Sequence, residues 1–507
     1  MKSKMFKKLM AAALATTMIA SLAACDGKTP ADGSTDASSS QGGSEVKPSS
    51  DAGQSSSETE VSKYTILKDE NGNVYDLGGM EIVIRDWWST WPPADDDGAK
   101  TEYDEAKEEY LDWIQTTYNF KIHQEKLDEW GDTPQKFVDY ASAPDDGANY
   151  VWVLRRDPAV MSAMSSGLMK DLSKLSCLDF SAKKFQLNKT HELFKYGDAI
   201  YAMYGDYSEP RTGMYFNERL LKEAGVDPEE IYDLQKNGQW TFDKFEEICK
   251  KVRQDKNNDG VYEVYAFGCN NGVFTEQAVY SNGGEFVGKD ASGKFVYKID
   301  DPKTVEGLNW ARDMFTEYRL QDPEGSEWDY YKNAFLNGEF VFLPDQAYLM
   351  NNDLKPAYDA DGNLTNPGMT DPVGFVMFPK GPSMSDYTNC WDNNLMCIPG
   401  NYSDDKAWKI AFAWNLYTDA NVNLPGFEDY KAWKNQYANG VVSDLRAINE
   451  TLDMMTTKGM VTYHGLIPAI DMGNWMTYLV YPNCPPISEI IEAHKAEFMT
   501  AIDEANK

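Results

Sequence analysis

Residues 212–268 read TGMYFNERLLKEAGVDPEEIYDLQKNGQWTFDKFEEICKKVRQDKNNDGVYEVYAFG, and this stretch decides the fold. Its apolar run Met214–Phe216 predicts a buried strand, and Glu218–Ala224 predicts a helix that stops at the following glycine. Thr241 is a favourable N-cap residue, so a second helix is expected after it. The apolar residues of that helix recur at helical spacing: Phe242, Phe245, Ile248, Cys249 and Val252. A strand is expected at Val261–Tyr265, so the stretch predicts alternating α and β elements.

The same alternation extends along most of the chain. Apolar runs predict strands at Met80–Arg85, Phe120–His123 and Tyr150–Leu154, and helical periodicity occurs in Tyr103–Tyr118. Later helices are expected at Pro302–Tyr318, Asp404–Thr418 and Ile487–Ala505. Strands that alternate with helices indicate open α/β sheets, and 507 residues suffice for two or three lobes with substantial cores.

The chain is strongly acidic. Its 81 Asp and Glu residues outnumber 48 Lys and Arg, for a formal net charge of −33 at pH 7. So negative a surface repels phosphate backbones and anionic lipid head groups, so nucleic acid is not an expected partner. The same charge argues mildly against a strongly anionic ligand. Aromatic residues make up 13% of the sequence, which argues against a disordered chain.

The first 25 residues have the pattern of an export signal. A lysine-rich start precedes the apolar run Leu9–Ala20 and the sequence Leu-Ala-Ala-Cys that ends at Cys25. That ending resembles the bacterial lipobox, which implies cleavage before Cys25 and acylation of its thiol; the alternative is an ordinary signal peptide with an incidental cysteine. We expect a signal peptide over 1–24 and a lipidated, flexible Ser-, Gly- and Asp-rich tether over 25–62. The protein would be extracytoplasmic, anchored by lipid alone to the outer face of the cytoplasmic membrane, because no later apolar run is long enough to span it.

Motifs for other chemistry are absent from the sequence. G-x-S-x-G, H-E-x-x-H, Walker A and G-x-G-x-x-G do not occur, so no enzyme is predicted. The six cysteines after Cys25 form no C-x-x-C and show no metal-ligand spacing. Thiols are therefore expected, with a Cys390–Cys397 disulfide as the alternative that export permits.

Three motifs of the opening stretch, in order, are Y-F-N-x-x-L-L-K-E-A-G, W-T-x-D-x-F-E and D-x-N-x-D-G-x-x-E-x-Y-x-F-G. This order resembles the extracellular solute-binding proteins of ABC importers, within the carbohydrate-binding branch. Further segments match the family order at Gly167–Leu172, Gly197–Met203, Ala334–Phe342 and Val373–Pro379. The resemblance covers nearly all of the chain after the tether.

The resemblance implies a two-lobed α/β fold of the type II periplasmic-binding-protein class, with a hinge and a ligand between the lobes. It assigns 63–207 plus 346–425 to the first lobe and 208–345 plus 426–507 to the second, with Val373–Pro379 as a strand that returns to the first lobe. It further implies a monomer that captures an oligosaccharide and delivers it to an ABC permease by hinge closure. The alternatives are the same fold binding another solute, such as a peptide or modified sugar, and an extracellular carbohydrate-active enzyme.

A sugar site needs aromatic platforms for C–H faces, together with amides and carboxylates for hydroxyl groups. The adjacent Trp87 and Trp88 follow the first strand, at the edge where open α/β sheets bind ligands. Other positions, such as Arg155 and Arg156 after the third strand, follow from the family order. The candidate ligand-binding residues are Asp86, Trp87, Trp88, Arg155, Asp157, Glu209, Arg211, Asn270, Asn271, Tyr348, Trp391, Asn474 and Trp475.

The loop that begins at Asp255 follows an EF-hand calcium loop over its first nine positions. Its oxygen donors would be the side chains of Asp255, Asn257, Asp259 and Glu263 and the carbonyl of Val261. Ala266 stands where an EF-hand has its bidentate glutamate. The sequence therefore predicts a structural Ca²⁺ with no catalytic role, and an ion-free Asx-rich turn is the alternative.

Overall fold

The computed structural model describes residues 63–92, 100–358, 362–391, 394–428, 430–438, 440–467, 475 and 484–506. The chain forms two compact units, residues 1–67 and 68–507, and the α/β elements belong to the second. The expected signal peptide, lipidated Cys25 and tether lie outside the described residues, and so does Asn474.

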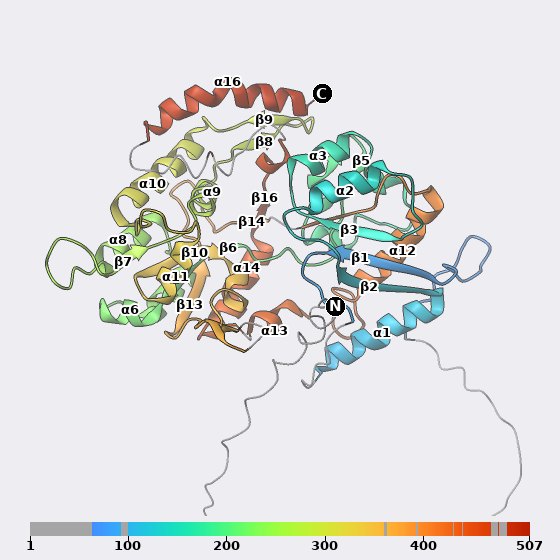
Figure 1. Ribbon diagram of the computed structural model, residues 1–507, viewed down its shortest axis with the longest axis horizontal. Helices are drawn as coiled ribbons and strands as arrows, with labels where there is room; N and C mark the ends of the chain where they lie inside the picture. The colour runs from blue at the N-terminus through green and yellow to red at the C-terminus, as the bar shows by residue number, and fades with distance from the viewer. Residues whose placement is uncertain are drawn as a thin grey trace, which may run out of the picture. The chain divides into compact units, whose positions relative to one another are not determined.

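One sheet of the second unit has the strand order β15-β3-β1-β2 (Figure 1). β1 (Met80–Asp86) lies between β2 (Phe120–Lys126) and β3 (Tyr150–Leu154) and is parallel to both. β15 (Leu395–Cys397) joins antiparallel to β3 at the edge. We call this sheet and the helices packed on it the first lobe. The predicted strands β1, β2 and β3 are confirmed.

Helices cover the first sheet because its strands are apolar on both faces. The packed helices are α1 (Glu102–Tyr118), α2 (Thr133–Ser142) and α12 (Asp404–Asp419). α1 begins in a capping box, in which Thr101 and Asp104 satisfy each other's backbone N–H groups. The smaller elements of this lobe are α3 (Pro158–Ser165), η1 (Leu172–Lys174), α4 (Lys183–Gln186), α5 (Thr190–Leu193), β4 (Lys195–Tyr196) and β5 (Ala199–Ile200).

A second sheet has the order β13-β6-β10-β7 and forms the core of the second lobe (Figure 1). Every residue of β6 (Thr212–Asn217) is buried, and it pairs antiparallel with β10 (Phe340–Gln346). The helices that follow β6 are α6 (Glu218–Glu223), α7 (Pro228–Lys236) and α8 (Phe242–Val252). The cap predicted for α8 is confirmed, because the Thr241 hydroxyl accepts a hydrogen bond from the Lys244 N–H at 3.3 Å.

Two expectations for this lobe are corrected. The strand expected at Val261–Tyr265 begins only at Tyr265, in β7 (Tyr265–Phe267), because Val264 instead pairs with Gln254 and closes the loop between them. The segment Val373–Pro379 does not return to the first lobe.

β13 (Val373–Met377) pairs antiparallel with β6, which places it in the second sheet. Gly374 lies opposite Phe216, whose ring occupies the space that a side chain at 374 would fill. Residues 346–425 therefore contain a strand of the second lobe. The chain crosses back later, between β14 (Asn389–Trp391) and β15.

The remaining elements complete the second lobe and the crossings. β14 pairs parallel with β16 (Gly459–Val461), and Figure 1 shows this ribbon between the two sheets. The elements between β7 and β13 are α9 (Asn271–Ser281), the hairpin β8 (Val287–Lys289) and β9 (Phe295–Tyr297), α10 (Pro302–Tyr318), α11 (Tyr330–Leu336), η2 (Ala347–Asn351), β11 (Ala357–Tyr358) and β12 (Leu364–Asn366). After α12 come α13 (Trp433–Ala438), the π-helical η3 (Ala447–Leu452), α14 (Asp453–Thr457), η4 (His464–Leu466) and α16 (Ile487–Ala505).

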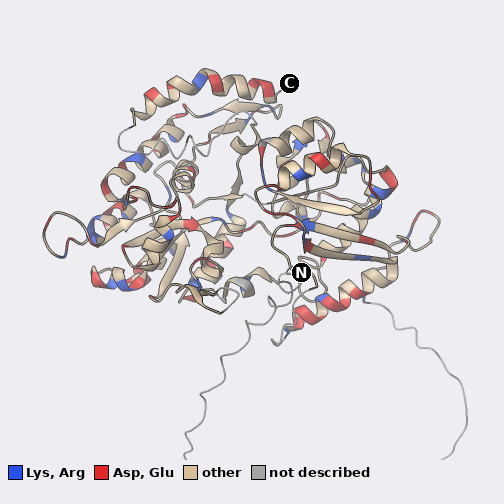
Figure 2. Ribbon diagram, in the orientation of Figure 1, with Lys and Arg blue, Asp and Glu red and all other residues tan. Residues whose placement is uncertain are grey.

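Acidic side chains lie on both lobes, and Figure 2 shows them on the outer helices α1 and α16 among scattered basic residues. None of the described helices is long and apolar enough to cross a membrane. The expected thiols are confirmed for all six cysteines of the described chain, since none is in a disulfide. Cys390 and Cys397 are both buried.

Candidate ligand-binding site

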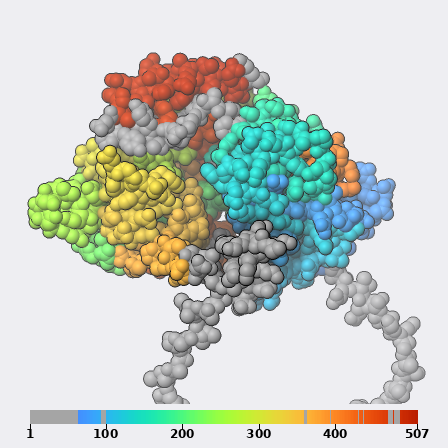
Figure 3. All heavy atoms as spheres, viewed as in Figure 1, coloured from blue at the N-terminus to red at the C-terminus, as the bar shows by residue number. Residues whose placement is uncertain are grey.

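A cavity of about 510 Å³ opens between the two lobes. Figure 3 shows a hollow where the atoms of the lobes meet. The first lobe and the second lobe, with the crossing that leads into it, both line the cavity. The lining residues are Trp87, Trp130, Arg155, Arg156, Arg211, Gln346, Tyr348 and Asn394. The sequence had singled out Trp87, Arg155, Arg211 and Tyr348 as candidate ligand-binding residues.

The loop after β1 brings Trp87 to the cavity, and Asp86 holds that loop. One carboxylate oxygen of Asp86 accepts hydrogen bonds from the N–H groups of Trp88 and Ser89, each at 3.0 Å. The other accepts from Gln124 Nε2 at 2.6 Å and from the Ser89 hydroxyl. Asp86 is fully buried, so the structure gives it a positioning role in place of the expected ligand contact.

Trp88 does not line the cavity, although it adjoins Trp87. Its ring meets the Trp87 ring edge-on at 4.9 Å and is half exposed. Two neighbouring indoles therefore have different roles: Trp87 faces the cavity, and Trp88 packs against its side.

Arg155 and Trp130 form a stacked pair at the first-lobe wall. The guanidinium carbon of Arg155 lies 4.4 Å from the centre of the Trp130 ring, and Arg155 Nε donates to the Trp130 carbonyl at 3.3 Å. Arg155 Nη2 also pairs with Asp157 at 2.9 Å. Asp157 in turn caps α3, because its carboxylate accepts from the Ala159 N–H at 2.9 Å. Asp157 thus holds Arg155 and does not itself line the cavity.

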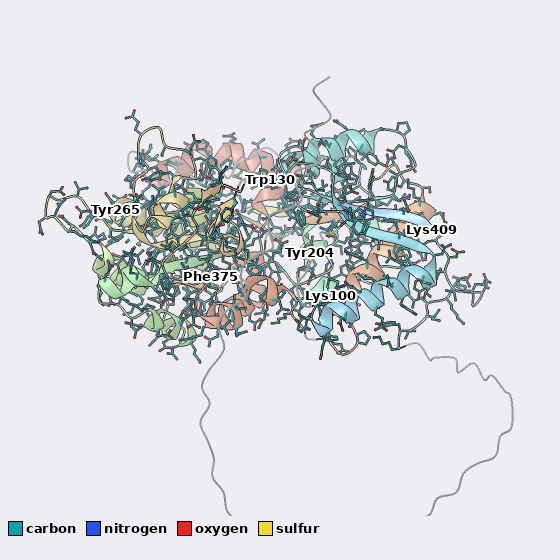
Figure 4. All side chains as sticks on the ribbon, turned by 60° about the horizontal axis from the view of Figure 1, so that its bottom comes forward. Lys100, Trp130, Tyr204, Tyr265, Phe375 and Lys409 are labelled. Carbon is teal, nitrogen blue, oxygen red and sulfur yellow. The ribbon has the colours of Figure 1, made fainter. Side chains whose placement is uncertain are left out.

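Trp130 was not singled out from the sequence. It follows β2, so it lies at the same sheet edge as the residues after β1 and β3, and Figure 4 shows it between the two lobes. A tryptophan in a polar loop at a strand end was the signal that could have found it, because 57% of its surface is exposed.

Arg156 joins the wall to the crossing near β16. Its Nη1 donates to the carbonyl and to the hydroxyl of Thr462, each at 2.9 Å. Thr462 follows β16 directly, so this contact links the end of β3 to a chain crossing.

Arg211 and Gln346 form the opposite wall. Arg211 precedes β6 and Gln346 ends β10, and these two strands are paired with Thr212 opposite Gln346. Arg211 Nη1 donates to Gln346 Oε1 at 3.2 Å, and Arg211 Nη2 pairs with Glu209 at 2.8 Å. Glu209 also accepts from the Tyr204 hydroxyl at 3.3 Å, so it positions Arg211 without lining the cavity.

A buried carboxyl group adjoins this wall. Asp345 is 4% exposed and comes immediately before Gln346 in β10. Desolvation raises the pKa of Asp345 to about 6, although its hydrogen bond from the Gln346 N–H opposes the shift.

The other candidate residues do not line the cavity. Asn270 caps α9 by accepting from the Val273 N–H at 3.1 Å, and Asn271 is buried in the first turn of that helix. Trp391 packs over Gly459, and its Nε1 donates to the Met455 carbonyl at 3.2 Å. Trp475 is 7% exposed and packs with apolar residues beneath α16. Its ring lies 5.3 Å from Phe498 and 6.4 Å from Phe286.

Lining residues that the sequence did not single out are Trp130, Gln346 and Asn394, and Arg156 appeared only as a neighbour of Arg155. Gln346 and Asn394 lie nearly fifty residues apart in the chain and in different lobes. No local pattern marks either amide, because only the packing of the lobes brings them to one cavity.

The Asp255 loop gathers acidic groups as predicted. Oxygens of Asp255, Asp259 and Glu263 all lie within 4.8 Å of one another. Asp255 accepts from the N–H groups of Asp259 and Gly260, and Glu263 accepts from the Lys256 N–H at 2.6 Å. These carboxylates are the hard oxygen ligands that Ca²⁺ prefers, so the donor set fits that ion.

Comparison with known proteins identifies relatives of this fold. Residues 186–424 match the family model described as bacterial extracellular solute-binding protein. Comparison with curated proteins finds no match.

Solved structures similar to the chain include three bacterial binding proteins. The cyclic α-maltosyl-1,6-maltose binding protein from Arthrobacter globiformis is 12% identical, with 84% of this chain and 100% of that chain covered and a TM-score of 0.55. The ABC substrate-binding protein Lmo0181 from Listeria monocytogenes, in complex with cycloalternan, is 15% identical, with 84% and 98% covered and a TM-score of 0.51. UgpB from Mycobacterium tuberculosis, in complex with glycerophosphocholine, is 14% identical, with 80% and 96% covered and a TM-score of 0.52. The two-lobed fold expected from the sequence is thereby confirmed.

Proposed function

We propose that this chain, a member of the family of bacterial extracellular solute-binding proteins, captures an oligosaccharide outside the cytoplasm and delivers it to an ABC permease. The family is one of binding proteins, and we propose that this member releases its ligand unchanged. The proposal rests on one observation above all. A cavity between two lobes is lined by aromatic rings, amides and guanidinium groups from both sides.

The lining chemistry suits a saccharide. Trp87, Trp130 and Tyr348 offer flat apolar faces, and Gln346 and Asn394 offer amide groups to hydroxyls. A cavity of about 510 Å³ lies within the range of small-molecule sites. The sugars in the Arthrobacter and Listeria structures favour a carbohydrate.

The placement of the lining residues supports hinge closure as the mechanism. Trp130 and Arg155 belong to the first lobe, whereas Gln346 and Tyr348 belong to the second. A ligand that contacts both walls stabilises the closed arrangement by its differential affinity for that state. The permease would then distinguish the closed, loaded protein from the open one.

The second candidate is a non-carbohydrate solute bound by the same fold. The glycerophosphocholine in the Mycobacterium tuberculosis structure is the observation in its favour. A peptide remains within this alternative, because guanidinium groups and aromatic rings also bind carboxylates and apolar side chains.

We also propose export and lipidation at Cys25, with residues 26–62 as a tether. Cys25→Ser should move the protein from the membrane fraction to the medium in cells that export it. Membrane retention of that variant would contradict the anchor. A monomer is expected, which light scattering of the exported form would check.

A ligand screen tests the proposed function. The chain from residue 63 onward would be examined by thermal shift and tryptophan fluorescence with oligosaccharides, monosaccharides and peptides. Binding to the folded state should raise the melting temperature in proportion to the logarithm of ligand concentration. An oligosaccharide that is bound and recovered intact supports the proposal. A response to peptides alone would replace the carbohydrate by the second candidate, and cleavage of the sugar would contradict the binding-protein role.

Finally, we propose that the Asp255 loop binds a structural Ca²⁺. Its support is the convergence of Asp255, Asp259 and Glu263 in a loop already shaped by its own backbone hydrogen bonds. Ca²⁺ there would stabilise the turn between α8 and β7 and take no part in ligand chemistry.

A further inference from the structure

The cavity holds an unusual share of the chain's guanidinium groups. The sequence contains nine arginines, and three of them, Arg155, Arg156 and Arg211, line this one cavity. Among the described residues that line it, none is an aspartate or a glutamate. The charge of the cavity wall is thus opposite to the net charge of −33 of the whole chain.

Hydrogen-bond donors exceed acceptors along this wall. Each guanidinium carries five N–H donors and no acceptor. The acceptor oxygen of Gln346 is already used, because it accepts from Arg211 at 3.2 Å, which leaves its amide N–H groups to face a ligand. A neutral sugar hydroxyl both donates and accepts, whereas this wall chiefly donates. A ligand group that only accepts matches it better.

The guanidinium groups are held in place before a ligand arrives. Asp157 and the Trp130 ring hold Arg155, Thr462 holds Arg156, and Glu209 holds Arg211. Groups fixed in this way lose little conformational freedom when a ligand binds. Asp157 and Glu209 balance two of the three positive charges, so one positive charge remains in excess.

The acidic surface does not cancel this excess. Charges in water are largely screened beyond about 8 Å at physiological ionic strength, so the groups at the wall dominate the local field. The expectation from net charge, which argued mildly against an anionic ligand, therefore does not govern this site.

Given the proposed function, we propose that the bound saccharide is acidic and carries a carboxylate on its sugar units. Arginine binds carboxylates through two parallel N–H···O bonds, which suits recognition of a planar uronate group. Trp87, Trp130 and Tyr348 then contact the sugar rings, and the guanidinium wall selects the charge.

Matched ligands test this inference. Calorimetry would compare trimers of galacturonate, glucuronate and mannuronate with their fully methyl-esterified forms and with neutral trisaccharides and sulfated disaccharides. We expect an oligouronate to bind best, its methyl ester to bind at least tenfold more weakly, and the difference to shrink as salt is raised. A neutral or sulfated saccharide as the tightest ligand would overturn the inference and leave the proposed function standing. If peptides bind and no saccharide does, the proposed carbohydrate function itself fails.

A variant shows whether the arginines set this selectivity. Arg155→Gln should lower the ratio of acid to ester affinity about tenfold. Arg253→Gln is the matched control, because Arg253 also stacks on aromatic rings but lies outside the cavity. Loss of folding would weaken acid and ester alike, so the ratio separates recognition from stability. An unchanged ratio in Arg155→Gln, and in Arg211→Gln as a second variant, would overturn the assignment.

Discussion

Arg211 and Gln346 meet across two paired strands, with Arg211 Nη1 donating to Gln346 Oε1 at 3.2 Å. Arg211 comes from the crossing into the second lobe and Gln346 from the end of β10, 135 residues later. The same strand ends are joined by the backbone, because the Ala347 N–H donates to the Arg211 carbonyl at 2.9 Å. The side-chain pair therefore lies on a rigid sheet edge and presents a fixed donor surface to the cavity.

Removal of the Gln346 amide should weaken ligand binding. Gln346→Ala removes one ligand-facing group and one partner of Arg211, so we expect about a tenfold loss of affinity for the best ligand of the screen. Calorimetry measures the loss, and Gln135→Ala on the outer surface of α2 is the control. Equal affinities in both variants would exclude Gln346 from the site.

Removal of the Trp130 ring should weaken binding more strongly. Trp130→Ala takes away an aromatic face and the surface on which Arg155 stacks, so a loss of roughly 10- to 100-fold is expected. Trp87→Ala should act in the same direction. Trp328→Ala is the control, since Trp328 is 74% exposed and lies outside the cavity lining. Fluorescence titration reads all three, and a Trp130 variant that binds like the control would contradict the site.

Trp475 should affect stability and not binding. Its ring is 7% exposed and packs on Phe498 and Phe286, so Trp475→Ala leaves a large cavity in that cluster. The expected cost is about 3–5 kcal/mol of unfolding free energy. Denaturant unfolding measures it, and binding well below the melting temperature should keep the wild-type affinity. A stable variant with lost binding would instead restore Trp475 to the site.

Asp345 should make stability depend on pH. Its pKa is raised from 3.8 to about 6 in the folded protein, so the folded state keeps this proton to a higher pH than the unfolded state. Wild-type stability contributed by this group is therefore present below pH 4 and is lost as the pH rises through about 6, by about 3 kcal/mol. Asp345→Asn removes this dependence.

Urea unfolding at pH 4, 5, 6 and 7 would follow the difference between Asp345→Asn and the wild type. The variant should gain stability relative to the wild type across this range, and then level off. Asp243→Asn, at an exposed carboxyl group in the first turn of α8, is the control and should show little change. A constant difference at all four pH values would contradict the raised pKa.

Calcium should raise the melting temperature and EDTA should reverse the effect. Asp255→Asn and Glu263→Gln each remove a carboxylate ligand, so they should abolish the response. Asp290→Asn is a matched control, because Asp290 shapes a similar exposed turn by accepting from the Ser292 and Lys294 N–H groups. The absence of any calcium shift in the wild type would favour the ion-free turn.

Local sequence determined the elements that depend on near neighbours. β3, α8 and α10 begin and end where apolar spacing, caps and glycines place them, because strand and helix formation is decided by contacts a few residues apart. The same holds for the gathering of carboxylates in the Asp255 loop, which lie within nine residues.

Partners that lie far apart in the chain were decided only by the tertiary structure. β13 reads as a buried strand whichever sheet receives it, and its place beside β6 depends on the fit of Phe216 over Gly374. Trp475 and Trp130 are both tryptophans in the sequence, yet burial separates a core ring from a cavity ring.

The sequence by itself thus determined the α/β class, the family resemblance and four of the eight residues that line the cavity. The tertiary structure decided the rest, including the convergence of three arginines in an acidic chain. The physical reason is that composition reports the sum of charges, whereas a ligand responds only to the groups within a few ångströms.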